Sequence, residues 1–214
     1  EGPLKGKYDL SFTVPSLCAE ALRSGQADVA VIPAIEYQRM DDVVVLPGMA
    51  IAARDEARSI LLIAKKPIEQ ARRIALDSSS RSSAALVRLL CAGRWKIAPE
   101  FVDAAPDPKA MLAEADAALL IGDPALRVVL RAEASPEELP VPGYPAVFLY
   151  DVAHEWREMT GRPCVLAMWV ARRGAVRPEV VADFLASREY GLDRIPEIAA
   201  KAAGQLNLPA RELE

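Results

Sequence analysis

The stretch SGQADVAVIPAIEY, residues 24–37, decides the fold of this chain. Gly25 ends a helical stretch, Asp28 precedes a buried strand that runs to Pro33, and a short helix is expected over 34–40. The stretch ADAALLIGDPAL, residues 115–126, repeats the same order of aspartate, apolar strand and helix start. Two such units in one chain predict an α/β fold with two lobes.

Apolar runs and turn residues continue this alternation along the chain. Further strands are predicted over residues 10–14, 43–46, 59–64, 73–77, 101–102, and 165–170. Further helices are predicted over residues 16–24, 84–92, 108–115, 125–130, 151–161, 178–187 and 195–203, with Ser16, Asp123 and Asp151 as N-caps. Residues 133–145 are rich in proline and glutamate and predict a surface loop.

Two stretches, 60–66 and 165–173, are long enough to cross from one lobe to the other. We therefore expect one lobe to comprise residues 1–65 and 165–214, and the other to comprise residues 66–164. This arrangement resembles the type 2 periplasmic-binding-protein fold, in which two α/β lobes hold a small ligand in the cleft between them. The resemblance covers nearly the whole chain but leaves the function open, because one fold serves many functions.

The composition limits the classes of function. The 214 residues are 52% hydrophobic and 26% charged, which is ordinary for a packed globular protein. A net charge of −4 argues against a nucleic-acid partner, and the longest apolar run, residues 164–171, is too short to span a membrane. Three widely spaced cysteines, Cys18, Cys91 and Cys164, are expected to be free thiols of a cytoplasmic protein.

The densest polar cluster is DSSSRSS, residues 77–83, between a predicted strand and a predicted helix. Backbone N–H groups at such a helix start attract anions, and five hydroxyls add donors, those of Ser78, Ser79, Ser80, Ser82 and Ser83. Arg81 would add a charged hydrogen bond to a carboxylate. The alternative is a helix cap with spare serines, but three consecutive serines followed by Arg-Ser-Ser exceed what one cap needs.

The facing wall of the cleft is expected from the first lobe, where a strand ends at Pro33. Ala34 and Tyr37 would line the ligand pocket there, and Glu36 would be a hydrogen-bond acceptor or the catalytic base. Helix capping by Glu36 and core packing by Tyr37 are the alternatives. Ser16 either presents a helix start to the ligand or merely caps that helix.

Gly122 and Asp123 follow the buried strand of the second lobe. Asp123 is an N-cap or a ligand contact, and the backbone of Gly122 can approach a ligand closely. His154, the only histidine, is expected at the surface or at a hinge. The sequence shows no metal-ligand spacing, glycine-rich phosphate loop or nucleophile elbow, so we expect no metal and no cofactor.

Several motifs now form a recognisable set. They are VPS at 14–16, GxxDVAxIPAIEY at 25–37, LDxSSRxS at 76–83, LLIGDxAL at 119–126, and YD at 150–151 with EW at 155–156 and TGxP at 160–163. Over about residues 12–173 the set resembles the MqnA family, the chorismate dehydratases of the futalosine route to menaquinone. The resemblance implies a lyase that removes water from chorismate, giving 3-[(1-carboxyvinyl)oxy]benzoate. Its ligand would be chorismate or a similar aromatic or cyclohexadiene dicarboxylate.

One part of the family pattern lies outside the sequence. The family begins with a strand and a Tyr-Leu-Asn type motif, whose Asn is assigned to the active site and which would precede Glu1. The chain is then expected to be either a fragment or a member without part of its site. The proton acceptor stays open between that segment, the substrate's own carboxylate and Glu36. The alternatives to the dehydratase are a solute-binding protein for small anions and an inactive, ligand-binding family member.

Overall fold

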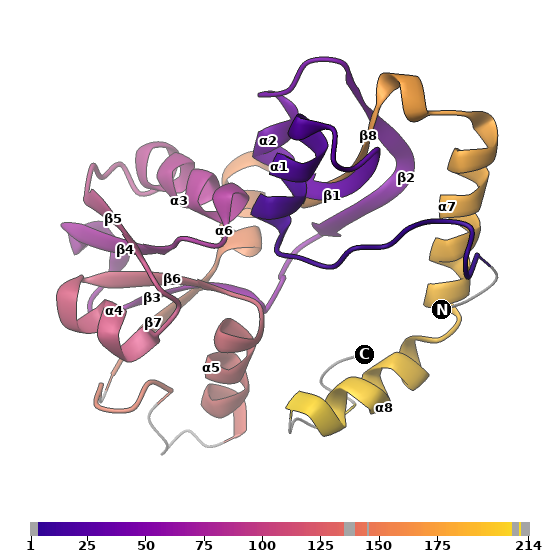
Figure 1. The fold of residues 1–214 in the computed structure, drawn as a ribbon. Helices are drawn as coiled ribbons and strands as arrows, with labels where there is room; N and C mark the ends of the chain where they lie inside the picture. Colours follow the sequence, from indigo (N-terminus) through magenta and orange to yellow (C-terminus); the bar gives the residue numbers. More distant parts are fainter. Residues whose placement is uncertain (1–3, 135–139, 145, 207–209, 211–214) are drawn as a thin grey trace.

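The strands of this chain form two separate sheets (Figure 1). The structure, a computed structural model, describes residues 4–134, 140–144, 146–206 and 210. The antiparallel three-stranded sheet has the order β1 (Val29–Pro33), β8 (Cys164–Arg172), β2 (Val43–Ala53). The five-stranded sheet has the order β5 (Glu100–Ala104), β4 (Arg73–Asp77), β6 (Ala117–Ile121), β3 (Ile60–Ala64), β7 (Phe148–Asp151).

The three-stranded sheet is packed on both faces. On one face, α1 (Pro15–Ser24) buries Ala19 and Leu22 against Ile32 and Val170. On the other face, α7 (Pro178–Leu192) packs against β2 and β8. The short helix α2 (Ala34–Tyr37) follows β1 directly, and α8 (Ile195–Leu206) follows α7. These elements make up the proposed first lobe.

The five-stranded sheet carries the larger core. β4 runs parallel to β5 and β6, while β3 is antiparallel to β6 and β7. Ile74 and Leu76 face α3 (Arg81–Gly93) and α6 (Val152–Thr160), whereas Ala75 faces α4 (Pro108–Glu114) and α5 (Asp123–Ala134). Because both faces are covered, these strands are continuous apolar runs, and the sequence pattern places β4 and β6 correctly.

The chain crosses between the sheets in short irregular segments. We predicted crossings at residues 60–66 and 165–173, but β3 lies wholly in the five-stranded sheet and β8 wholly in the three-stranded one. The crossings are residues 54–59 and 161–163, because a fully paired strand cannot belong to two sheets. The division into two lobes stays a proposal, but its boundary at residue 65 moves to the first crossing, because β3 belongs to the five-stranded sheet.

Asp151 fastens the first crossing to α6. Its Oδ2 accepts hydrogen bonds from the N–H groups of Ala57 (3.0 Å) and Arg58 (2.6 Å). Its Oδ1 caps the helix by accepting from Ala153 (2.9 Å) and His154 (3.0 Å). The predicted N-cap at Asp151 is confirmed, and the same side chain also holds the segment between the lobes.

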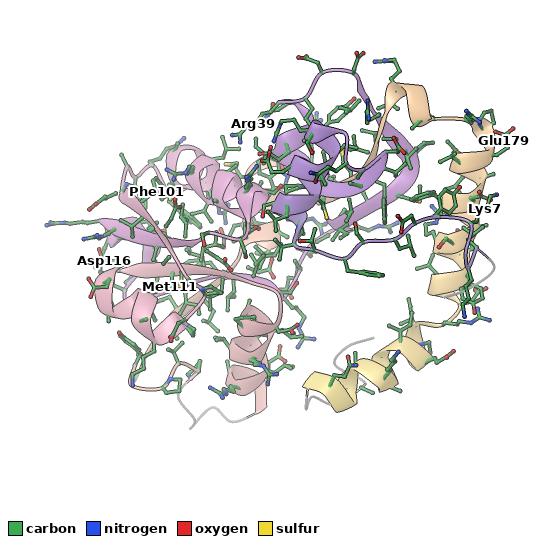
Figure 2. The ribbon with its side chains drawn as sticks, in the orientation of Figure 1. Lys7, Arg39, Phe101, Met111, Asp116 and Glu179 are labelled. Atoms are coloured by element: carbon green, nitrogen blue, oxygen red, sulfur yellow. The ribbon has the colours of Figure 1, made fainter. Side chains whose placement is uncertain are left out.

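The amino-terminal segment differs most from expectation. Residues 10–14 form no strand and are exposed, Phe12 by 92%. Their alternating pattern favours a strand, but a strand needs a hydrogen-bonding neighbour and the described residues give it none. Earlier in this segment, Tyr8 donates a hydrogen bond to Asp183 of α7 (2.6 Å), and Figure 2 shows Lys7 beside the same helix. Burial, together with Asp183, raises the pKa of Tyr8 to about 12.

Three smaller expectations also need correction. Ser16 is not an N-cap: α1 starts at Pro15 and its N-cap is Val14. Asp123 is the first residue of α5 and follows Gly122, which has a φ of 64°. The predicted 133–145 loop begins too early, because α5 runs to Ala134, and its residues 135–139 and 145 lie outside the described residues. The edge strand β7 was not predicted.

Candidate functional site

The amino end of α3 meets α1 and α2 where the two lobes touch. The backbone N–H of Ile35 donates to Ser82 Oγ at 3.4 Å. Arg81 Nη1 lies 3.0 Å from Glu20 Oε1 on α1 and 3.2 Å from Glu36 Oε2 on α2. The structure therefore places the predicted residue sets 33–37 and 78–83 against one another.

Glu36 is the centre of an ion-pair cluster. It is 1% exposed, and its oxygens also contact Arg23 (2.7 Å) and Arg39 (3.0 Å), the latter labelled in Figure 2. Burial alone would raise the pKa of Glu36, but the hydrogen bond from Arg23, the charge of Arg81 and the contacts of Arg39 hold it below its usual value.

These contacts make Glu36 a weak base. Both of its carboxylate oxygens are committed to guanidinium groups, and a lowered pKa reduces the drive to accept a proton. The catalytic role expected for Glu36 therefore finds no support in the geometry. Together with Glu20, it anchors three arginines, so that the five-residue cluster keeps one positive charge in excess.

The serine loop is partly committed to its own structure. Ser80 is the N-cap of α3, and its Oγ accepts from the N–H of Ser83 (3.3 Å). The hydroxyl of Ser79 donates to Asp77 Oδ1 at 2.6 Å, so in this arrangement it can only accept from a ligand. The N–H groups of Arg81 and Ser82, in the first turn, have no intrahelical acceptor and remain available to an anion.

The burial of the serines varies along the loop. Ser78 is exposed, Ser79 and Ser80 are half-buried, and Ser82 and Ser83 are buried at the lobe contact. The five hydroxyls expected as donors are therefore not equivalent. The hydroxyl of Ser80 accepts from Ser83 but can still donate, so it and the two helix-start N–H groups can donate to an anion.

The loop lies at a switch point of the five-stranded sheet. The parallel strands β4 and β6 end at the same edge. After β4 the chain turns through α3 towards β5, and after β6 it turns through Gly122 and Asp123 towards the other side of the sheet. Open α/β sheets bind ligands where the loops of adjacent strands diverge in this way. Gly122 and Asp123 are thus on the opposite side of this point from the serines, and both are exposed.

The other predicted residues belong to the first lobe and the hinge. Pro33 is buried, Ala34 is half-buried, Tyr37 is 36% exposed and Ser16 is half-buried. His154 is half-buried, and its Nδ1 lies 2.9 Å from Asp55 Oδ1 on the first crossing. The hydrogen bond with Asp55 raises the pKa of His154.

Two surface hollows flank this region. One, of about 370 Å³, is lined by Arg23, Arg39 and Arg172 among others, and the first two of these pair with Glu36. The other, of about 470 Å³, is lined by Asp123, Arg127 and Arg131 with four prolines. Neither hollow is lined by the serines.

Sequence reasoning missed three members of the ion-pair cluster around Glu36. Glu20, Arg23 and Arg39 carried no motif, and only the helical spacing of Glu20 and Arg23, three residues apart on α1, pointed to a charged pair. In the part of the chain that the structure describes, no three His, Cys, Asp or Glu side chains are grouped as metal ligands. None of the helices described is long and apolar enough to cross a membrane.

The fold and the lobe contact define the class of protein: a two-lobed α/β molecule of the periplasmic-binding-protein type. A solved protein from Archaeoglobus fulgidus has a TM-score of 0.65 at 22% identity, with 94% of this chain and 72% of that one covered. The alkanesulfonate-binding protein of Xanthomonas axonopodis pv. citri, bound to MOPS, has a TM-score of 0.58 at 16% identity, covering 95% and 70%. At these identities the likeness shows the fold alone.

The chain belongs to the menaquinone biosynthesis family VitK2_biosynth, whose family model matches residues 3–214. A curated relative, the chorismate dehydratase of Thermus thermophilus, is 28% identical over 215 residues, which is 94% of this chain and 75% of the relative. The family resemblance and the fold class expected from the sequence motifs are confirmed.

Proposed function

We propose that this chain is a chorismate dehydratase of menaquinone biosynthesis. It would eliminate water from chorismate to give 3-[(1-carboxyvinyl)oxy]benzoate. The observation that carries the proposal is the position of the start of α3, with Arg81, at the contact between the lobes of a chain in the menaquinone biosynthesis family. The name of the Thermus thermophilus relative supplies the reaction.

The chemistry suits what these residues offer. The ring loses a hydroxyl and a neighbouring proton and becomes aromatic, so the protein has to hold two carboxylates and exclude water. The N–H groups of Arg81 and Ser82, the Ser80 hydroxyl and the Arg81 guanidinium would hold one carboxylate from the second lobe. Pro33, Ala34, Tyr37 and Ser16 would line the facing wall, with Gly122 and Asp123 at the edge of the site.

Arg81 would change partners when the ligand binds. It now bridges Glu20 and Glu36, yet Glu36 would keep Arg23 and Arg39 if Arg81 moved to a ligand carboxylate. The buried charge of Glu36 therefore stays compensated in both arrangements, and the exchange costs little. We place the reaction in the cytoplasm and assign no part of it to Glu36 as a base.

A second candidate is binding of a small anion without turnover, favoured by the fold that the chain shares with alkanesulfonate-binding proteins. Incubating the protein with chorismate and separating the mixture by chromatography distinguishes the two. The dehydratase predicts a new aromatic product whose mass is lower by one water. Recovery of unchanged chorismate from a protein that binds it would favour the second candidate.

A further inference from the structure

Asp77, at the carboxyl end of β4, has a buried oxygen without a partner. The residue is 2% exposed. Its Oδ1 accepts from both the N–H (2.9 Å) and the hydroxyl (2.6 Å) of Ser79. Its Oδ2 is buried and makes no hydrogen bond with the residues that the structure describes. A buried carboxylate oxygen in this state destabilises the fold, so it calls for an explanation.

The position of Asp77 suggests a ligand as the explanation. Asp77 is the last residue of β4, on the strand that borders the switch point between β4 and β6. The two bonds to Ser79 turn the carboxylate towards the loop that opens α3, and Oδ2 stays close to that loop because it shares a carbon with Oδ1. An ionised carboxylate only accepts hydrogen bonds, so the missing partner is a donor.

We propose that Asp77 Oδ2 accepts a hydrogen bond from a ring hydroxyl of the ligand. This inference rests on the proposed function, in which the substrate carries a hydroxyl that the product has lost. Asp77 would then distinguish the two: its oxygen is paired in the substrate complex and unpaired again once the hydroxyl has left. A site built to bond a hydroxyl discriminates strongly against the analogue that lacks it, so the product is released more readily.

The test is Asp77→Asn, with Asp107→Asn as the matched control. Asn keeps the carbonyl oxygen that Ser79 bonds and replaces the other oxygen with an NH2 donor. Asp107 is the N-cap of α4 in the same lobe, where its Oδ1 accepts from Lys109 and Ala110, and an Asn there still caps the helix. We expect Asp77→Asn to raise the KM for chorismate about tenfold or more, to change product inhibition less than about twofold, and to leave the melting temperature at or above that of the control.

Two results would overturn the inference: a KM equal to that of Asp107→Asn, or an equal loss of affinity for substrate and product. If the wild-type protein does not dehydrate chorismate, the proposed function fails instead, and the inference is decided by calorimetry with shikimate and cyclohex-1-ene-1-carboxylate. These ring carboxylates differ in their hydroxyls. The wild type should bind shikimate more tightly and Asp77→Asn should lose that preference; equal binding, or binding of neither, would contradict the inference.

Discussion

Replacing Arg81 with Gln separates ligand binding from lobe stability. The change removes a side chain that lies 3.0 Å from Glu20 and 3.2 Å from Glu36, but Glu36 keeps Arg23 at 2.7 Å and Arg39 at 3.0 Å. Because no buried charge is left unpaired, and because Arg81 is 37% exposed, we expect the free energy of unfolding to fall by only about 1 kcal/mol.

The loss of ligand affinity should be larger. A hydrogen bond to a charged group contributes about 1.5–3 kcal/mol, which corresponds to roughly ten- to a hundredfold in Kd. The assay is calorimetric titration with the product, 3-[(1-carboxyvinyl)oxy]benzoate, which avoids turnover, together with thermal melting. Arg88→Gln is the matched control, since Arg88 lies on the same helix but stacks over Phe101, 4.2 Å from its ring centroid.

Two outcomes would refute this reasoning. Unchanged affinity in Arg81→Gln would move the carboxylate site away from α3. A collapse of the melting temperature would show that Arg81 mainly holds the lobes together, and that Arg23 and Arg39 do not compensate Glu36 as their distances indicate.

Three further predictions concern the serines, the hinge and the thiols. Replacing Ser79 and Ser80 together with Ala should weaken product binding by roughly tenfold or more in calorimetry while the fold survives, because a helix cap contributes only about 1 kcal/mol; unchanged affinity would contradict the assignment. His154 has a raised pKa in the folded state, so its pairing with Asp55 stabilises the fold below the unfolded pKa, and this stabilisation is lost as the pH rises through the folded pKa. The melting temperature of the wild type should therefore fall slightly over this pH range, and that of His154→Gln should not. If the melting temperatures of both proteins change with pH in the same way, the pairing does not contribute. Burial raises the pKa of Cys91 and of Cys164 to about 11 and should protect both thiols until the protein unfolds. Thiol-labelling of the native protein at neutral pH, read by mass spectrometry, should therefore modify Cys18 before Cys91 and Cys164.

The sequence predicts element bounds best where turn or cap residues flank a buried apolar run. The bounds of β4 and β6 follow from apolar runs between turn residues, and the cap at Asp151 follows from its position before α6. Strand pairing is different, since it depends on a distant partner. Residues 10–14 have a strand pattern but stay unpaired, whereas β7 has a partner in β3 and forms at an edge.

The motifs predicted which two residue sets face one another, but not the contacts between them. The motifs located residues 33–37 and 78–83 on facing sides. The ion pairs that occupy both oxygens of Glu36, however, depend on Arg81, which is 45 residues away in the sequence, and on Arg23 and Arg39. Likewise, the free oxygen of Asp77 is visible only when the partners of its carboxylate are known. Such properties arise from packing between elements, and no spacing rule encodes them.

The most direct test of the account is a crystal structure of the protein with 3-[(1-carboxyvinyl)oxy]benzoate bound. We expect one carboxylate within hydrogen-bonding distance of the Arg81 and Ser82 N–H groups, with the Arg81 guanidinium turned from Glu36 to the ligand and Glu36 still held by Arg23 and Arg39. A ligand seated instead in the hollow beside Asp123 and Arg127, with Arg81 still on Glu36, would contradict it.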